Sequence, residues 1–263
     1  SLVHKLQRGF YDSRGDSAAT MSLDWHEDSG IAAAIRWGTV RVFDPESGRQ
    51  RWSKRYGSMY PSAVEWNDAG TRLLHGGKDA DTVIYDHEGT KLANFPRVGG
   101  DTRATWINDR EIVYGGSNQD VQTFDVLEKQ RTNEFHIHQW SVETLAIAAD
   151  GTFLAGSADG TLRRIRLNDP ANRALKVDAH PPGTAHGLSW RADGKVIGTA
   201  ALAHGEARVW NADSGELIAQ LVADSGGGTD IEWNSDGSKL VTLHQWQVRF
   251  WDPDTYELLR QQR

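Results

Sequence analysis

The sequence predicts an all-β fold, because one unit of four short strands repeats about every 40 residues. A first anchor residue recurs at intervals of 40 to 43 residues, and a second, mostly aromatic anchor follows each first anchor 18 to 20 residues later. No segment keeps an apolar period of 3.6 residues over three turns, which argues against helices. The first anchors are Trp25, Trp66, Trp106, Ile147, Trp190 and Trp233; the second are Phe43, Tyr85, Phe124, Ile165, Trp210 and Trp251.

Residues 229–263 show the four strands of one unit most clearly. Residues 229–233 alternate toward an apolar end, and an Asn-Ser-Asp-Gly turn follows. Residues 239–243 and 247–251 are rich in β-branched and aromatic residues, and Asp-Pro-Asp-Thr closes the second of these runs. Residues 256–261 complete the unit. Short runs of this composition, separated by Asp, Gly, Pro and Asn, predict an antiparallel meander.

The same order of strands and turns repeats through the chain, so we expect one domain over residues 1–263. A four-stranded sheet with a period near 40 residues buries both of its faces by stacking radially as a propeller blade. We therefore predict a β-propeller with six complete four-stranded antiparallel blades. The expected blades are residues 18–57, 58–98, 99–138, 139–182, 183–227 and 228–263, and residues 2–9 are expected to add an extra outer strand.

Six blades of four strands and one extra strand make 25 strands, whereas a seven-bladed ring has 28. Three explanations for this difference stay open. The first strand could be an additional edge on a self-closed ring of six blades. A seven-bladed parent protein could supply the missing strands after Arg263. Alternatively, a partner could supply three strands in trans, because exposed sheet edges accept added strands.

The chain resembles the WD-repeat family of β-propellers, chiefly at its third strands and turns. The matching residues are Trp251-Asp252, Trp210-Asn211, the aromatic-Asp pairs that end at Asp44, Asp86 and Asp125, the Asp-Gly turns at 150–151, 193–194 and 236–237, and the run 156–161. This resemblance implies the propeller fold. It also implies a protein-binding platform, since propellers of this family mostly serve other proteins.

The resemblance further implies a buried set of polar side chains in some blades. The set comprises a His before the first strand, a Ser or Thr in the second, an Asp in the next turn and a Trp in the third. His138, Ser157 and Asp159 fit the first three roles, whereas Ile165 replaces the Trp. His138 is therefore expected to be structural, and His180 is a weaker match.

Composition argues against several classes of function. The net charge is −7, whereas a nucleic-acid-binding domain is normally basic. The chain has no cysteine, which excludes disulfides and thiolate zinc sites but does not fix the compartment. No apolar stretch approaches the roughly 20 residues of a membrane-spanning helix. His136 and His138 could share a strand face, but two histidines make an incomplete metal site, and no catalytic motif or cofactor site is predicted.

The anchor tryptophans at 25, 66, 106, 190 and 233 are expected to pack between blades. Other aromatic residues fall in turns and connections that the resemblance places on one common face. Aromatic residues beside polar ones are typical of interaction surfaces. The expected partner-binding residues are Trp37, Tyr60, Trp140, His204 and Trp246.

The leading hypothesis is a non-enzymatic scaffold that binds a protein or peptide on this face, as a module of a larger protein or complex. One alternative is a carbohydrate-binding, small-ligand or hydrolytic propeller that uses the channel mouth. Its polar candidates are Asp79, Asp159, His136 and His204. Another alternative is a structural or engineered repeat protein without a ligand.

Overall fold

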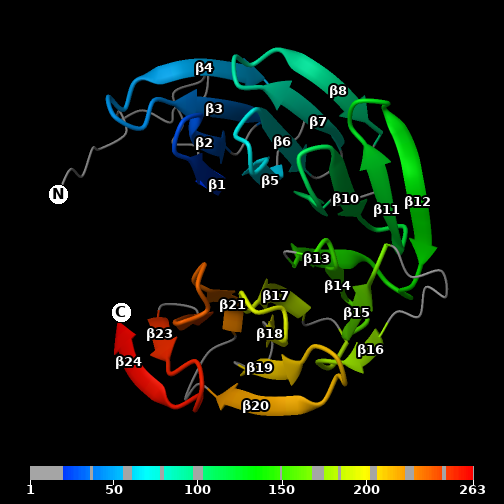
Figure 1. Ribbon diagram of the computed structural model, residues 1–263, viewed down its shortest axis with the longest axis vertical. Helices are drawn as coiled ribbons and strands as arrows, with labels where there is room; N and C mark the ends of the chain where they lie inside the picture. Colours follow the sequence, from blue (N-terminus) through cyan, green and yellow to red (C-terminus); the bar gives the residue numbers. More distant parts are fainter. Residues whose placement is uncertain are drawn as a thin grey trace. The chain divides into compact units, whose positions relative to one another are not determined.

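The protein is all-β and consists of six four-stranded antiparallel sheets. The computed structural model describes residues 20–35, 38–55, 61–77, 80–96, 103–148, 150–167, 175–182, 185–201, 206–222, 228–244 and 247–262. In each sheet the four strands lie side by side in chain order, as Figure 1 shows. This is the topology of β-propeller blades, so the predicted fold class is confirmed. The expected extra strand at residues 2–9 lies outside the described residues.

The chain divides into two compact units, residues 1–135 and 136–263. The expectation of a single domain over residues 1–263 stays a prediction. The strands of the first unit, the last of which ends at the boundary, are β1 (Thr20–His26), β2 (Gly30–Ile35), β3 (Thr39–Phe43), β4 (Gln50–Arg55), β5 (Pro61–Trp66), β6 (Arg72–Gly77), β7 (Ala80–Asp86), β8 (Lys91–Phe95), β9 (Arg103–Trp106), β10 (Glu111–Gly115), β11 (Asp120–Asp125) and β12 (Gln130–His136).

The second unit repeats the same arrangement in three further sheets. Its strands are β13 (Val142–Ile147), β14 (Phe153–Ser157), β15 (Thr161–Ile165), β16 (Leu175–Asp178), β17 (Ala185–Trp190), β18 (Val196–Ala201), β19 (Glu206–Asn211), β20 (Leu217–Val222), β21 (Gly228–Trp233), β22 (Leu240–His244), β23 (Gln247–Trp251) and β24 (Leu258–Gln262). The last sheet matches the strands expected from residues 229–263 to within two residues. The largest difference is at Tyr256, whose φ of 61° places it in the turn before β24.

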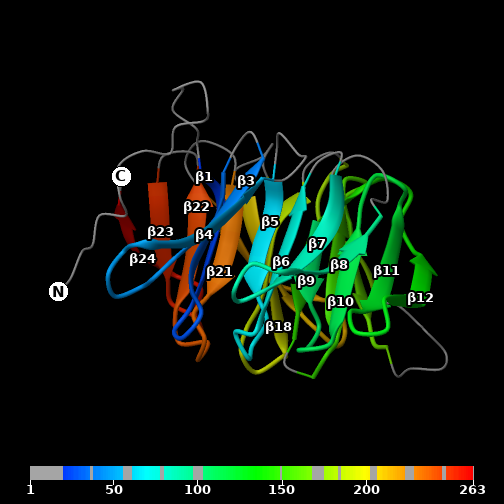
Figure 2. The same ribbon diagram turned by 90° about the horizontal axis from the view of Figure 1, so that it is seen from above.

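Consecutive sheets within each unit pack face to face, with their first strands side by side. β1 lies beside β5 and β5 beside β9; likewise β13 lies beside β17 and β17 beside β21. Figure 2 shows the strands of each sheet running between two sets of turns. Each hydrophobic cluster takes side chains from two consecutive sheets; one joins Val40 and Val42 to Trp66 and Tyr85. Apolar burial between neighbouring sheets therefore stabilises each unit.

Three of the anchor tryptophans donate a hydrogen bond to the preceding sheet of their unit. Trp66 Nε1 donates to the carbonyl of Gly30 (3.0 Å) and Trp106 Nε1 to that of Glu65 (3.1 Å). Trp190 Nε1 donates to Ala146 (3.4 Å). The rings of Trp66 and Trp106 are buried, as is that of Trp233, while Trp190 is half-buried. The repeat period thus places one indole at each of these junctions between sheets.

Trp25 differs from the expectation that it packs in the core, because 62% of its surface is exposed. It lies on β1, in the first sheet of its unit. The tryptophans that follow find a carbonyl acceptor on the sheet before them, and this unit has no described sheet before β1. Burial at an anchor position therefore requires a preceding sheet in addition to the tryptophan itself.

The Asp or Asn after a third-strand anchor closes the turn that follows. Its side-chain oxygen accepts from a backbone N–H three or four residues later, as Asp44 does from Ser47 (2.8 Å) and Asp252 from Thr255 (2.8 Å). The predicted Asp-Gly turns join first and second strands, and each of their glycines has a positive φ, for example 78° at Gly151. That backbone region favours glycine, which explains the recurring dipeptide.

The carboxyl group of Glu65 lies between two sheets and accepts a hydrogen bond from an uncharged hydroxyl group. Thr105 Oγ1 on β9 donates to Glu65 Oε1 on β5 (2.9 Å). Burial raises the pKa of Glu65 to about 8; the nearby Asp24 acts in the same direction, and the hydrogen bond from Thr105 opposes both. Glu65 is therefore largely protonated at neutral pH and ionises only in mildly alkaline solution.

We predict that Glu65→Gln reduces the dependence of stability on alkaline pH. The folded-state pKa exceeds the ordinary value of 4.5, so stability from protonated Glu65 is complete below about pH 4.5 and is lost as pH rises through about 8. Each tenfold difference in proton affinity corresponds to about 1.4 kcal/mol. Urea unfolding between pH 5 and 9 should show the variant gaining stability relative to wild type as pH rises. Parallel pH profiles for the two proteins would contradict this assignment.

Candidate partner-binding surface

The described residues include one of the five residues predicted to contact a partner. Trp140 lies in the connection of residues 137–141 between β12 and β13. The other four, Trp37, Tyr60, His204 and Trp246, lie outside the described residues. The part of the candidate surface that the structure describes therefore consists of Trp140 and its neighbours, in the second unit.

The turn between β14 and β15 fixes the backbone on both sides of Trp140. Asp159 Oδ2 accepts from the backbone N–H of Gln139 (2.8 Å). Ser157 Oγ donates to the carbonyl of Trp140 (3.3 Å), and Ala158 N donates to the carbonyl of Ser141 (2.9 Å). Three consecutive residues of the connection thus bond to one neighbouring turn. These bonds hold the backbone of the connection in one conformation.

His138 belongs to the same connection and is held by a buried polar cluster beneath the surface. Its ring is buried, and Nδ1 lies 3.0 Å from Thr161 Oγ1, whose hydroxyl donates to Asp159 (2.6 Å). Because that hydroxyl proton goes to Asp159, Nδ1 of His138 is the donor in the other bond. Burial lowers the pKa of His138 to about 4, although the charge of Asp159 acts in the opposite direction. The imidazole is consequently neutral at pH 7 and has a structural role.

The side chain of Trp140 is largely outside this network, and 51% of its surface is exposed. The hydrogen bond from Ser157 engages the backbone carbonyl of Trp140 and does not involve its ring. An aromatic ring carried on a fixed backbone offers contact area at low entropic cost. This arrangement suits the recognition of another molecule.

The sequence predicted a polar set of His138, Ser157 and Asp159 and did not indicate Thr161, which lies beside the imidazole. Ser157 bonds to the backbone of Trp140 and Asp159, while Thr161 takes the position beside the imidazole. The signal for Thr161 was the local sequence Asp-Gly-Thr, in which Asp159 Oδ1 accepts from the Thr161 N–H (2.8 Å). Asp turns of this kind place the second residue after the Asp next to its carboxylate.

His180, the weaker match, belongs to a polar set with Thr199 and Trp210, which includes the tryptophan that the His138 set lacks. His180 Nε2 lies 2.8 Å from Thr199 Oγ1, which also accepts from Trp210 Nε1 (2.9 Å). The last sheet has a related set that the sequence did not indicate, in which Thr242 Oγ1 accepts from Trp251 Nε1 (2.8 Å) and lies 2.8 Å from His244 Nε2. Both sets are buried and join strands of their sheets.

Of the four polar candidates for a catalytic or small-ligand site, the structure describes only Asp159 and His136. Asp79 and His204 lie outside the described residues, and Asp159 is engaged by the connection that carries Trp140. No group of three or more His, Asp or Glu side chains among the described residues could hold a metal ion. Among the same residues, no helix has the length and apolar character needed to cross a membrane.

Comparison with known proteins places this surface within a recognised repeat. The family model described as WD domain, G-beta repeat matches residues 129–164, which contain His138, Trp140 and Asp159. An uncharacterized WD repeat-containing protein of Synechocystis is 33% identical over 98 residues, covering 37% of this chain and 28% of that protein. The ribosome biogenesis protein YTM1 of Phaeosphaeria nodorum is 27% identical over 125 residues, covering 43% of this chain and 26% of YTM1.

The matched parts of this chain thus span only about a quarter of the length of each relative. The family match and both relatives agree with the repeat unit that the sequence and the six sheets define. WD repeats generally mediate interactions between proteins, and the match to this family is consistent with a scaffold role.

Proposed function

We propose that the chain is a non-enzymatic scaffold of the WD-repeat type, which binds a protein or peptide through the surface around Trp140. The observation that carries this proposal is an exposed indole on a backbone that a buried cluster holds in place. Tryptophan is among the residues that most often dominate binding energy at protein interfaces. A fixed backbone reduces the entropy that ordering would cost on binding.

We propose that Trp37, Tyr60, His204 and Trp246 extend this surface. Like Trp140, they fall in turns or connections between strands of the repeat. A turn rarely requires a tryptophan for its own geometry, which favours contact with a partner. The structure does not describe these four residues, and their part in the surface rests on their positions in the repeat.

The partner is proposed to be protein rather than nucleic acid. The similarity to a protein named for ribosome biogenesis supports a role in a larger assembly, in which this chain is one module. A net charge of −7 opposes direct contact with a phosphate backbone, since such binding is driven by clustered basic residues. We therefore infer that contact with any such assembly is through its proteins.

We expect Trp140→Ala to weaken partner capture at least tenfold while the melting temperature changes little. The loss follows from removal of an aromatic anchor, and the unchanged stability follows from the exposure of the ring. Immobilised wild-type and variant protein would be compared for capture of binding proteins from extracts of the source organism, with quantification by mass spectrometry. Differential scanning calorimetry would report the stability of both.

Leu259→Ala is the matched control, because Leu259 is also an exposed apolar residue (65%) but lies on the outer strand β24. It should leave capture unchanged. If Trp140→Ala lowers capture and the melting temperature together, the ring is structural and the proposal fails. Equal losses in the Trp140 and Leu259 variants would also contradict it.

A further inference from the structure

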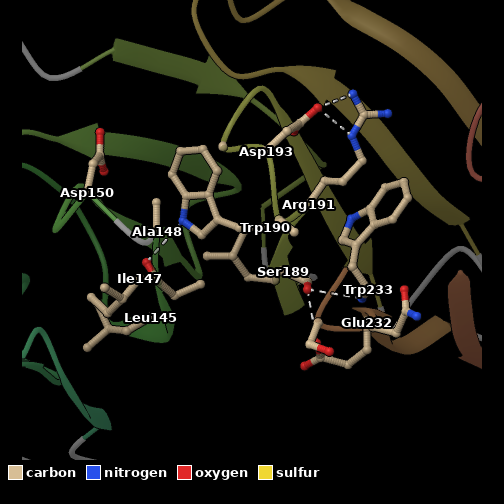
Figure 3. A pocket seen from close by; sticks show the side chains of 16 residues that line it. Leu145, Ile147, Ala148, Asp150, Ser189, Trp190, Arg191, Asp193, Glu232 and Trp233 are labelled. Atoms are coloured by element: carbon tan, nitrogen blue, oxygen red, sulfur yellow. Dashed lines mark hydrogen bonds and ion pairs between the residues drawn. The ribbon is translucent and has the colours of Figure 1, made fainter. Parts of the chain in front are cut away.

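A cavity of about 610 Å³ opens in the second unit, at the end of β13 opposite the Trp140 connection. It is bounded by the last residues of the first strands β13, β17 and β21 and by the turns that follow them (Figure 3). This volume lies within the range of sites that hold drug-sized molecules or short peptide segments. Ile147, the exception in the tryptophan series, lies in the wall. Its side chain is smaller than an indole and occupies less of this space.

The charged groups of the wall give the cavity an excess of negative charge. They are Asp150, Asp193, Glu232 and Arg191. Arg191 is neutralised by Asp193, to which Nη2 and Nε donate at 2.6 Å and 3.0 Å. Glu232 receives one hydrogen bond, from Ser189 Oγ to Oε2 (2.9 Å), and its side chain is exposed to the cavity. Among the described residues, Glu232 therefore has spare acceptor capacity and no cationic partner.

The wall also holds a buried hydrogen-bond donor without an acceptor. Trp233 is only 8% exposed, and its Nε1 has no hydrogen-bond partner among the described residues. In the three other junctions this same indole nitrogen donates to a carbonyl of the preceding sheet. This nitrogen is fully buried and lies close to Gly198 of the preceding sheet, so a bound molecule does not reach it. Its resonance can nevertheless report on changes in the wall that Trp233 helps to form.

Apolar and aromatic surface lies beside these polar groups. Leu145, Ile147 and Leu188 line the cavity, as does the half-buried ring of Trp190. A ligand that suits this wall needs an apolar stem and a cationic head. The side chain of arginine or lysine supplies both.

We propose that this cavity binds a basic side chain of an extended peptide segment. The cation lies against Glu232 and the face of Trp190, and its aliphatic stem lies against the apolar wall. Charge-assisted hydrogen bonds to a carboxylate are stronger than neutral ones, so the positive charge of the ligand determines the specificity of the site. This is a second site, separate from the Trp140 surface.

The direct test is titration of the full chain with three capped tripeptides, Ala-Arg-Ala, Ala-Lys-Ala and Ala-citrulline-Ala. The readout is the indole Nε1–H resonance of Trp233, assigned with the Trp233→Phe variant. Burial raises the pKa of Glu232 to about 7, although the hydrogen bond from Ser189 acts in the opposite direction. The titrations are therefore made at pH 8.5, where Glu232 is ionised. We expect the arginine and lysine peptides to shift this resonance, and the citrulline peptide to bind at least tenfold more weakly.

Glu232→Gln keeps the size of the side chain and should weaken arginine-peptide binding at least tenfold. Glu65→Gln is the matched control, because Glu65 also pairs with a hydroxyl of a neighbouring sheet but lies outside the cavity. It should leave the affinity unchanged, as should Trp140→Ala, which separates this site from the proposed function. Equal binding of the citrulline peptide, an unmoved Trp233 resonance, or an equal loss in the Glu65 variant would overturn the proposal.

Discussion

Replacing Trp66 by alanine should lower the free energy of unfolding by about 3–5 kcal/mol, the range for removing a buried tryptophan or phenylalanine side chain. Trp66 is buried in the cluster between the first two sheets, where it contacts the core around Val42 and Leu73. Its indole N–H also donates to Gly30 on the preceding sheet. The substitution therefore removes apolar contacts and leaves a cavity at a junction between sheets. Urea unfolding followed by far-ultraviolet circular dichroism measures the loss.

Trp25→Ala provides the comparison, because it removes the same side chain from the same repeat position. Since 62% of Trp25 is exposed, its loss should cost less than about 1 kcal/mol. A loss equal to that of the Trp66 variant would show that Trp25 is packed as tightly as the other anchors. It would contradict the explanation that its sheet has no preceding sheet in the first unit.

Thr199→Val should destabilise the protein by about 2–6 kcal/mol although the two side chains have nearly the same shape. The Thr199 hydroxyl accepts from Trp210 Nε1 (2.9 Å) and lies 2.8 Å from His180 Nε2, and all three residues are buried. Valine would leave both ring nitrogens unpaired, and each unsatisfied buried group costs about 1–3 kcal/mol. Differential scanning calorimetry would show a lowered melting temperature.

Thr199→Ser keeps the hydroxyl and separates the hydrogen bonds from the loss of a methyl group. It should retain most of the stability that Thr199→Val loses. Valine keeps the methyl group that serine lacks, so a valine variant as stable as wild type would show that the polar set has little energetic weight.

The strand order and the turns were predictable because their signals lie within a few residues of one another. Asp44 and Asp252 accept from backbone groups three residues later, and Gly151 needs a positive φ within its own turn. The spacing of the anchors likewise follows from one repeat length. The all-β fold of six four-stranded sheets was therefore accessible from the sequence alone.

Features that depend on contacts between distant residues were not accessible in this way. The exposure of Trp25 depends on which sheet lies beside it, and its own sequence resembles that of the buried anchors. Ser189 and Glu232 meet across 43 residues, so the cavity that they line has no local signature. His180 matched the repeat poorly by spacing, yet its ring reaches a threonine 19 residues away.

The central claim is that the ring at position 140 contacts a protein partner. The most direct measurement is photo-crosslinking with p-benzoylphenylalanine at position 140, with the same group at the exposed position of Ile218 on β20 as a control. We expect position 140 to crosslink to the proteins that the wild-type chain captures and Trp140→Ala loses, while position 218 does not. Absence of these crosslinks at position 140, or equal crosslinking at position 218, would contradict the claim.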